Sequence, residues 1–553
     1  MSSFPEKRAK SRRRPAPAKA GVPERPRALI VGISRDLHDN GRVLPLAGGF
    51  LKAYADKKLG GKFEIRTLNV FNFDSDQVLD QVASWDPEIV AFSCYLWNSR
   101  NVETLCRSIR KKYPRKRIIL GGPEASGRKA EMLERFEADA LVIGEGEASF
   151  ADLLSRYLAG RSWKSTPGTL VRSGGAVHAG PPRPVIPDLD SIPSPFLDAA
   201  STIGGQKGGF YTFETMRGCP NKCSYCVWTD LNAKKLRYFS DKRIASDLCR
   251  ITENRPTCVF IADSDMFLNQ ARALRLAPFF RAVATRRKGY YFVFQTNLNL
   301  WSGKLMRAWN HENFDMNIGV NSVNPAVQKI LGRCYPKSLV EKQLALMRRV
   351  APRTRITMQF MFAAPGETFA KFCESFDWAW RQPITFMLFF HTQPLYGTVM
   401  RERAEELGIK CRSVPPYHII STKECTAAEI KTEGLMILIA AVWMALPQSR
   451  GLYVKIADTY FGGSLSAAFL DIWEKLDAAT RRLSFRTWDR FNGGSDWFPD
   501  DFQLDLMYGY APPKTKPFIK AAYAALSAAH ARLSGVRGEA KPGRPAPGSG
   551  ANR

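Results

Sequence analysis

Three cysteines stand close together in one short segment of the chain: Cys219, Cys223 and Cys226. Their spacing is Cys-x3-Cys-x2-Cys, and no fourth cysteine is near enough to complete a local set. Three thiolates can hold three irons of a [4Fe–4S] cluster and leave the fourth iron open to a small molecule. A zinc site needs a fourth Cys or His nearby, and His178 and Cys249 are not at the spacing of a zinc knuckle. Three buried thiols without a metal are the other alternative.

The cysteine spacing, with the aromatic Tyr225 directly before the third cysteine, resembles the radical S-adenosylmethionine (SAM) superfamily. The resemblance implies that the cysteines ligate a [4Fe–4S] cluster whose open iron binds the amino and carboxylate groups of SAM. An electron from a low-potential reductant, such as flavodoxin or ferredoxin, would then cleave SAM to a 5′-deoxyadenosyl radical. The resemblance also implies a partial (β/α)6 barrel with its active site at the C-terminal ends of the strands.

Further segments resemble the SAM-binding parts of this superfamily. Asp263 ends the second predicted barrel strand, where polar groups meet the SAM amino group. Ser322 follows the strand whose Ser or Gln contacts the ribose or the carboxylate. The turn Pro365-Gly366-Glu367-Thr368 resembles the turn that lies near adenine. Carboxylates at strand ends are also ordinary helix N-caps. Arg217, just before the cysteines, balances the charge of the cluster or is simply solvated.

Short apolar runs alternate with amphipathic stretches in the first part of the chain, which predicts a doubly wound parallel sheet. Ligands of such sheets bind at the carboxyl ends of the strands, and Gly and Ser residues fall there in this sequence. The predicted strands span residues 28–32, 88–93, 117–122 and 140–144.

The residues at these strand ends resemble the cobalamin-binding domain fused to one large branch of radical SAM enzymes. Ser93 ends one strand, Gly121-Gly122-Pro123-Glu124 follows the next, and Gly144-Glu145-Gly146-Glu147 follows the last. The resemblance implies that Ser93, Gly121, Gly122 and Glu145 contact cobalamin. The alternatives are a Rossmann-like domain that binds nothing and a plain nucleotide site. The first turn lacks the Gly-x-Gly-x-x-Gly of a dinucleotide site.

The segment Asp36-Leu37-His38-Asp39-Asn40-Gly41 resembles the Asp-x-His-x-x-Gly motif of methionine-synthase-like cobalamin domains. In those domains the His ligates cobalt and the Asp orients its other ring nitrogen. Most radical SAM members lack this motif. His38 is therefore a candidate cobalt ligand, and the alternative is a solvated histidine in a polar loop that matches by chance.

A second strand–helix series begins immediately before the cysteines, and long amphipathic helices follow it. The predicted barrel strands span residues 210–214, 258–262, 291–295, 316–320, 356–360 and 386–390. We expect a disordered basic tail over 1–27, a cobalamin-binding Rossmann-like domain over 28–160, a linker over 161–205, a radical SAM partial barrel over 206–400, a helical region over 401–534 and a second disordered tail over 535–553.

Composition limits the cellular setting. The remaining eight of the 11 cysteines are scattered singly and form no disulfide framework, which favours a reducing cytoplasm. The N-terminus has no apolar core of a secretory signal. The longest apolar run, residues 435–446, is too short to span a bilayer. It predicts a buried core helix, with association to a membrane surface as the alternative.

The net charge of +29 favours nucleic acid, anionic lipid or acidic small molecules without choosing among them. The basic residues are not interleaved with aromatics as a nucleic-acid stacking platform requires, so no clear nucleic-acid site is predicted.

Together the motifs predict a cobalamin-dependent radical SAM enzyme. The resemblance implies methylation of an unactivated carbon, or of phosphorus, in a small molecule such as a lipid, a tetrapyrrole or a specialised metabolite. One SAM would methylate cobalamin and a second would give the radical. One alternative is a non-methylating reaction, such as the oxidative cyclisation of a porphyrin ester. Another is a cobalamin-dependent sensor or binding module, but a sensor has no use for an open iron.

Overall fold

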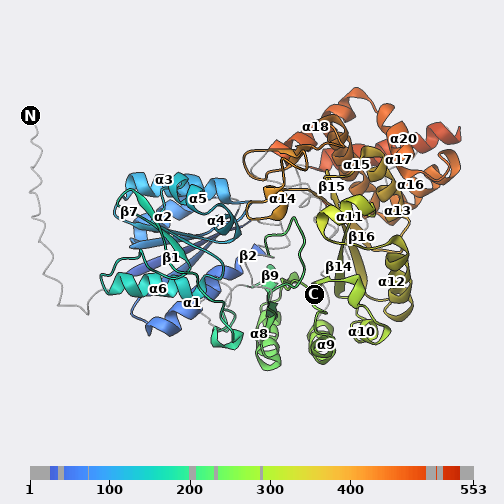
Figure 1. The fold of residues 1–553 in the computed structure, drawn as a ribbon. Helices are drawn as coiled ribbons and strands as arrows, with labels where there is room; N and C mark the ends of the chain where they lie inside the picture. The colour runs from blue at the N-terminus through green and yellow to red at the C-terminus, as the bar shows by residue number, and fades with distance from the viewer. Residues whose placement is uncertain are drawn as a thin grey trace, which may run out of the picture.

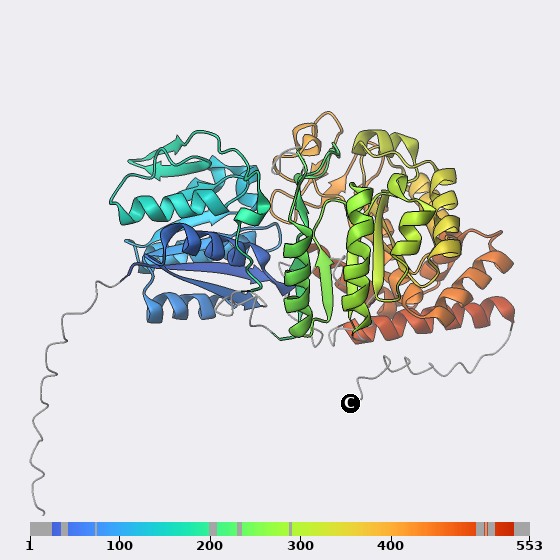
Figure 2. The same cartoon turned by 90° about the horizontal axis from the view of Figure 1, so that it is seen from below.

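The computed structural model describes residues 25–34, 43–71, 74–197, 207–228, 235–286, 290–493, 503, 506 and 515–535. Its two large sheets have seven strands each, and long helices follow the second sheet. The two sheets lie side by side, and the C-terminal helices gather beyond the second sheet (Figures 1 and 2). The predicted α/β class with a helical C-terminal region is confirmed.

The first sheet has the strand order β3-β1-β4-β5-β6-β7-β8. Its first five strands in this order pair in parallel, and β7 and β8 add antiparallel pairs at one edge. The strands are β1 Arg27–Ser34, β3 Glu64–Phe71, β4 Ile89–Ser93, β5 Arg117–Gly121, β6 Ala140–Val142, β7 Thr169–Ser173 and β8 Ala176–Ala179. The sequence predicts β1, β4, β5 and β6 but misses β3, β7 and β8. The last two lie in residues 161–205, where only a linker is expected.

Helices cover both faces of the first sheet, because successive residues of a strand point to opposite sides. Ala28 and Ile30 of β1 pack with α1 Leu46–Leu59 and α6 Glu147–Leu158. Leu29 and Val31 belong to the core on the opposite face. That face is covered by α2 Ser75–Trp85, α3 Ser99–Lys112, α4 Pro123–Arg128 and α5 Ala130–Arg135. This unit is doubly wound, as predicted.

The second sheet is parallel throughout, in the order β16-β15-β14-β13-β12-β9-β2. The six predicted barrel strands are present: β9 Phe210–Phe213, β12 Cys258–Ile261, β13 Tyr291–Thr296, β14 Phe314–Asn321, β15 Arg355–Phe362 and β16 Phe386–His391. Among the described residues, β9 and β16 do not pair, so the barrel is partial. The short β2, Val43–Leu44, comes from the first part of the chain and pairs with β9, which joins the two units through backbone hydrogen bonds.

The helices of the partial barrel lie outside its sheet (Figure 2). They are α8 Asp241–Glu253, α9 Gln270–Thr285, α10 Gly303–Ala308, α11 Pro325–Leu331, α12 Lys337–Val350 and α13 Phe369–Trp380. The core of this unit also includes Leu46 and Phe50 of α1. The hydrophobic contact between the two units is therefore continuous with the barrel core.

The C-terminal region consists of α14 Val399–Glu402, the short strands β17 Lys410–Cys411 and β18 Ile419–Ser421, and the helices α15 Ala427–Ala445, α16 Pro447–Tyr460, α17 Leu465–Glu474, α18 Ala478–Gly493 and α20 Lys516–Ser534. Thr426 and Glu429 form a capping box that begins α15. The apolar run falls almost entirely in α15, and its residues 435–444 are buried, so the expected core helix is confirmed. In the described part of the chain, no helix combines the length and apolarity needed to cross a membrane.

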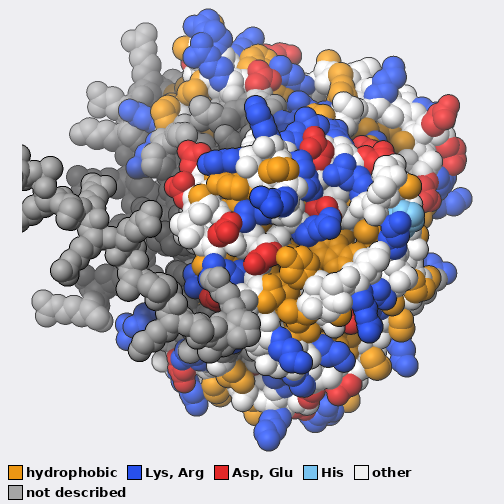
Figure 3. Space-filling view, turned by 90° about the vertical axis from the view of Figure 1, so that its left-hand side faces the viewer, with side chains coloured by type: hydrophobic (Ala, Val, Ile, Leu, Met, Phe, Trp, Pro, Cys, Tyr) orange, Lys and Arg blue, Asp and Glu red, His pale blue; other side chains and the backbone are white. Residues whose placement is uncertain are grey.

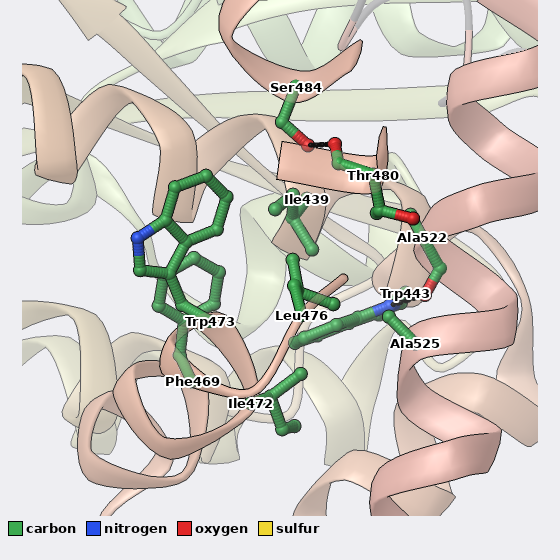
Figure 4. A pocket seen from close by; sticks show the side chains of 10 residues that line it. All are labelled: Ile439, Trp443, Phe469, Ile472, Trp473, Leu476, Thr480, Ser484, Ala522 and Ala525. Atoms are coloured by element: carbon green, nitrogen blue, oxygen red, sulfur yellow. Dashed lines mark hydrogen bonds between the residues drawn. The ribbon is translucent and has the colours of Figure 1, made fainter. Parts of the chain in front are cut away.

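A small cavity lies among α15, α17, α18 and α20 (Figure 4). Its volume is about 10 Å³, and its walls are mostly apolar. A space of this size holds at most about one water, so this cavity is core packing. On the face drawn in Figure 3, Lys and Arg side chains are spread among Asp and Glu over much of the surface.

Candidate active site between the two sheets

A cavity of about 800 Å³ lies between the strand ends of the first sheet and the inner face of the partial barrel. The first sheet contributes Gly32, Ser93, Gly121 and Gly144 from the ends of β1, β4, β5 and β6. The barrel contributes residues from all six of its strands, among them Thr212 of β9. Small-molecule and cofactor sites have volumes of roughly 300–1,000 Å³, so this cavity is large enough for a ligand held by both units.

All four described residues that the sequence predicts around cobalamin line this cavity: Ser93, Gly121, Gly122 and Glu145. Gly122 has φ 99, and a Cβ there would lie 2.5 Å from the backbone oxygen of Cys94. The turns after β4 and β5 are therefore in close contact, and only glycine fits without moving the backbone. This leaves the strand ends open to a ligand.

His38 and its motif partners Asp36 and Gly41 lie outside the described residues. Ser34 and Pro45, on either side of the segment 35–42, both line the cavity. Whether His38 ligates a metal stays a prediction.

The Gly-Glu-Gly-Glu motif makes ion pairs with the barrel unit. Arg217 lies 2.7 Å from Glu147, 3.0 Å from Glu214 and 3.8 Å from Glu145. Arg237 Nη1 donates to Glu145 Oε2 at 3.0 Å. We call these five side chains the interdomain ion network. Carboxylates thus neutralise Arg217. This differs from the sequence-based interpretation in which Arg217 balances the charge of the cluster.

The interdomain ion network is buried, and this shifts its ionisation. Burial alone would raise the pKa of Glu147, but the charge and hydrogen bond of Arg217 outweigh it and leave that pKa below its ordinary value. Burial raises the pKa of Glu214 even though Arg217 acts in the opposite direction. Arg217 is therefore the main counter-ion of Glu147 and Glu214, and the charge of Arg237 adds a smaller effect on Glu147.

A second interdomain contact involves Glu124, the last residue of Gly-Gly-Pro-Glu. Tyr417 Oη donates a hydrogen bond to Glu124, and Arg128 lies 3.6 Å away. Burial raises the pKa of Glu124. Gly127 of α4 contacts the backbone of Tyr396 so closely that a Cβ would come within 2.5 Å of its oxygen. The glycines of this motif therefore line the ligand cavity, whereas its glutamate contacts the C-terminal region.

The cysteine loop is held by the barrel on two sides. Ser224 N and Oγ donate to the backbone oxygens of Leu331 and Ile330 at 3.1 and 2.8 Å, and Met400 N donates to Ser224 O at 2.8 Å. Gly332 has φ 68, and a Cβ there would meet the backbone oxygen of Lys222 at 2.9 Å. The loop thus has one defined path between α11 and α14.

The three loop cysteines are free thiols in partly or fully buried positions. Burial, with smaller contributions from the charges of the neighbouring Cys223 and Cys219, raises the pKa of Cys226 to about 11, so the three sulfurs lie within electrostatic range of one another. In the described residues, no three His, Cys, Asp or Glu side chains are grouped so that they could hold a single metal ion. Three thiols on one loop fit a [4Fe–4S] cluster, in which each thiolate would ligate a different iron.

Polar residues surround this loop. Asn321 Nδ2 donates to Tyr225 Oη at 2.8 Å. Asp265 Oδ1 accepts from Phe267 N at 2.8 Å, while its Oδ2 is buried and has no partner among the described residues. Burial raises the pKa of Asp265 to about 7. Asp265 and Asn321 are functional candidates that the sequence did not single out, although Asp265 closes the same strand-end segment as Asp263.

The Asp263 carboxylate is already engaged. Its Oδ1 accepts from Thr215 N at 2.7 Å and from Met216 N at 3.1 Å, and Thr215 Oγ1 donates to Oδ2. Asp263 thereby fixes the turn that leads from β9 to Arg217 and the cysteines. Asp265, two residues later, has the unpartnered oxygen.

Ser322 and Glu367, two of the predicted SAM-site residues, contact each other in the structure. Ser322 Oγ donates to Glu367 Oε1 at 3.1 Å, and both side chains are buried. Burial and the charge of the nearby Glu433 raise the pKa of Glu367 to about 8. The SAM-site candidates predicted from the sequence do not line the 800 Å³ cavity. They are Tyr225, Asp263, Ser322, Pro365, Gly366 and Glu367.

Comparisons with known proteins agree with this geometry. A family model for the B12 binding domain matches residues 50–154, and one for the radical SAM superfamily matches residues 213–379. The chain is 30% identical over 232 residues to the cobalamin-dependent radical SAM methyltransferase TokK of Streptomyces tokunonensis, which is 40% of this chain and 34% of that protein. It is 26% identical over 275 residues to the hopanoid C-3 methylase of Methylococcus capsulatus, 47% of this chain and 50% of that protein. The matched region is therefore only a third to a half of these relatives.

Among solved structures, the fold is similar to the radical SAM methyltransferase TsrM of Kitasatospora setae with cobalamin and a [4Fe–4S] cluster bound. The TM-score is 0.59 at 16% identity, over 92% of this chain and 100% of that one. At this identity the likeness shows the shared fold, including the order of the two sheets and the C-terminal helices.

Proposed function

We propose that this chain, which belongs to the radical SAM enzymes that carry a B12 binding domain, is a cobalamin-dependent methyltransferase acting on a small molecule. The observation that carries the proposal is the continuous 800 Å³ cavity, lined by strand ends of the first sheet and by the inner face of the barrel. When bound, the cluster and SAM supply a 5′-deoxyadenosyl radical and cobalamin supplies the methyl group. A substrate in the cavity lies between the two units that hold these groups.

The residues that would hold the cofactors follow from the site. Cys219, Cys223 and Cys226 ligate the cluster from a loop fixed between α11 and α14. Ser93, Gly121, Gly122 and Glu145 surround cobalamin, where the glycines allow close approach to the backbone. Tyr225, Asp263, Ser322 and the turn Pro365-Gly366-Glu367 form the SAM side of the barrel. We add Asp265, because its unpartnered oxygen fits a donor such as an amino or hydroxyl group.

The protein's own residues hold the two units together around the cavity. Glu145, Glu147, Glu214 and Arg217 of the interdomain ion network lie in the cavity wall, where they join Gly-Glu-Gly-Glu to the turn that leads to the cysteines. Joining the two units at this point limits the access of water, which would otherwise consume a reactive intermediate. His38 stays a proposed cobalt ligand.

We also propose a reducing, cytoplasmic setting, because all 11 cysteines are free, with a flavodoxin- or ferredoxin-like reductant as the electron donor. The alternative of membrane-surface association loses its main support, since the apolar stretch of α15 is buried.

The proposal is tested with full-length protein, reconstituted anaerobically with iron, sulfide and cobalamin. It is supplied with SAM that carries a CD3 group and with fractionated cell extract. We expect 5′-deoxyadenosine and one product that gains the mass of a labelled methyl group. The triple variant Cys219→Ala/Cys223→Ala/Cys226→Ala should form neither. Formation of 5′-deoxyadenosine without label in any product would refute methyl transfer and favour a non-methylating reaction.

A further inference from the structure

Four carboxamide side chains from neighbouring parts of the barrel line the same cavity: Gln295, Asn317, Gln359 and Gln393. They come from β13, β14, β15 and the segment directly after β16. Gln295 and Asn317 are register partners, and Gln359 lies two residues beyond Thr357, the partner of Asn317. Residues two apart on a strand point to the same face, so Gln295, Asn317 and Gln359 point to the same face of three neighbouring strands. Together with Gln393, which lines the same cavity, we call them the carboxamide strip.

None of the four carboxamides makes a side-chain hydrogen bond to another residue in the part of the chain that the structure describes. Asn317 is only 4% exposed, and its Oδ1 is buried without a partner. Each carboxamide has two donor hydrogens and an acceptor oxygen, and leaving a buried one such as that of Asn317 unpaired costs free energy. A ligand that supplies the missing partners explains why apolar residues do not occupy these positions.

Among the described residues that line the cavity, no positive charge is free. The charged residues in its lining are Glu145, Glu147, Glu214 and Arg217, all of which belong to the interdomain ion network. With Arg237 included, three carboxylates face two guanidinium groups, a surplus of one negative charge (3 − 2 = 1). A carboxylate or phosphate group placed here would face this surplus and would find no free cation among the described lining residues.

Aromatic side chains make up a further part of the inner wall. Phe210, Phe260 and Phe390, from β9, β12 and β16, line the cavity opposite or beside the carboxamides. Aromatic faces favour flat or apolar parts of a ligand. A pure hydrocarbon would satisfy these walls but would leave the carboxamide strip without partners.

We propose that the substrate is an uncharged molecule with an apolar or flat body that presents amide, lactam or hydroxyl groups to the carboxamide strip. This rests on the proposed function and narrows its substrate: hydrocarbon lipids and polycarboxylate tetrapyrroles are disfavoured. Cobalamin itself carries carboxamide groups at its ring edge and could supply the same chemistry. The experiment therefore needs separate readouts for cofactor and substrate.

Cell extract is divided into uncharged polar, acidic, basic and lipid fractions, and each is incubated with the cofactor-loaded full-length enzyme and CD3-labelled SAM. We expect the label in the uncharged polar fraction. In Asn317→Leu and Gln359→Leu, the initial rate of labelled-product formation from a fixed, limiting amount of that fraction should fall at least tenfold, about 1.4 kcal/mol. Corrinoid content and substrate-free SAM cleavage should stay at the wild-type level. Gln81→Leu, on α2 and away from the cavity, is the matched control. Label in the acidic or lipid fraction would overturn the inference.

Loss of corrinoid from either variant would also overturn it, because the strip would then face the cofactor. If wild type cleaves SAM but labels no product, the methyltransferase proposal fails, and a second measurement still tests the strip. The substrate-free, cofactor-loaded Asn317→Leu variant should unfold at a higher temperature than wild type, since an unpartnered carboxamide is removed. A lower unfolding temperature would show that Asn317 has a structural partner, and the inference would be wrong.

Discussion

Arg217→Met tests whether the interdomain ion network joins the two units. The guanidinium lies 2.7, 3.0 and 3.8 Å from Glu147, Glu214 and Glu145. The Arg217 side chain is 8% exposed, so water cannot replace it as a partner. Met has a similar length without the charge. The variant therefore leaves Glu147 and Glu214 buried without the cation that the wild-type structure provides, while Glu145 keeps Arg237.

Removal of one partner from a buried ion pair typically costs about 3–5 kcal/mol, and we expect a loss of this size in the free energy of unfolding at pH 7. The direction in which stability changes with pH provides an independent test. In wild type the pKa of Glu147 is lowered, so its contribution to stability is present above its ordinary pKa and is lost as the pH falls through the folded-state value. Without Arg217, burial raises the pKa of both carboxyls, and the folded state then binds more protons than the unfolded state. The variant should therefore gain more stability between pH 7 and pH 5 than wild type does.

The assay is thermal unfolding of the full chain at pH 7 and pH 5, with corrinoid retention as a local readout of the contact between the units. Lys222→Met, at an exposed position in the cysteine loop, is the matched control and should behave as wild type. A loss below about 1 kcal/mol, the range of exposed pairs, would refute the reasoning. So would a loss that does not diminish at pH 5.

Three further predictions concern other parts of the site. Gly122→Ala should lower the free energy of unfolding by about 1–3 kcal/mol and release corrinoid, because φ is 99 and the new Cβ meets Cys94 O at 2.5 Å. Gly175→Ala, with φ 78 and open space around it, is the control for backbone strain alone. Because the pKa of Glu367 is raised in the folded state, wild type should lose stability as the pH rises from about 4.5 to about 8. Glu433→Gln should make this loss smaller, since it removes a charge that raises the pKa of Glu367. An unchanged pH profile in thermal unfolding would contradict this. If His38 ligates cobalt, electron paramagnetic resonance of bound cob(II)alamin should show nitrogen splitting that His38→Ala removes, and a wild-type spectrum without splitting would rule the ligand out.

The central strands could be predicted because they are buried on both faces and read as continuous apolar runs. β4, Ile89–Ser93, is buried at every position, whereas β3, Glu64–Phe71, is an edge strand in which most residues are partly exposed. β7 and β8 lie at the opposite edge in a segment rich in Pro and Gly. The edges were missed because their strands carry weaker hydrophobic patterns than the interior does.

The candidate site was predictable only where its residues are close in sequence. The cysteine spacing and the strand-end motifs are local, and the structure gathers Ser93, Gly121 and Glu145 at one cavity. The partners of these motifs are not local. Glu145 meets Arg237 across 92 residues, and Glu124 meets Tyr417 across 293. A sequence pattern shows that a carboxylate stands at a strand end but not which cation or hydroxyl the folded chain brings to it.

The burial of these charges has a consequence for mechanism. Apolar side chains of similar size often stabilise a contact as well as a buried ion pair does, so stability alone does not explain the interdomain ion network. An apolar contact tolerates sliding, whereas Arg217, which lies 3.0 Å from Glu214 of its own unit, must also stay 2.7 Å from Glu147 of the first unit to keep the ion pair. We infer that the network fixes the distance across the cavity. Arg217→Met/Glu147→Leu should then recover about half of the stability lost in Arg217→Met, because fewer unpaired charges are buried. It should still cleave SAM without efficient methyl transfer, since the placement is no longer fixed. Recovery of both stability and the wild-type ratio of product to 5′-deoxyadenosine would show that the network only holds the units together.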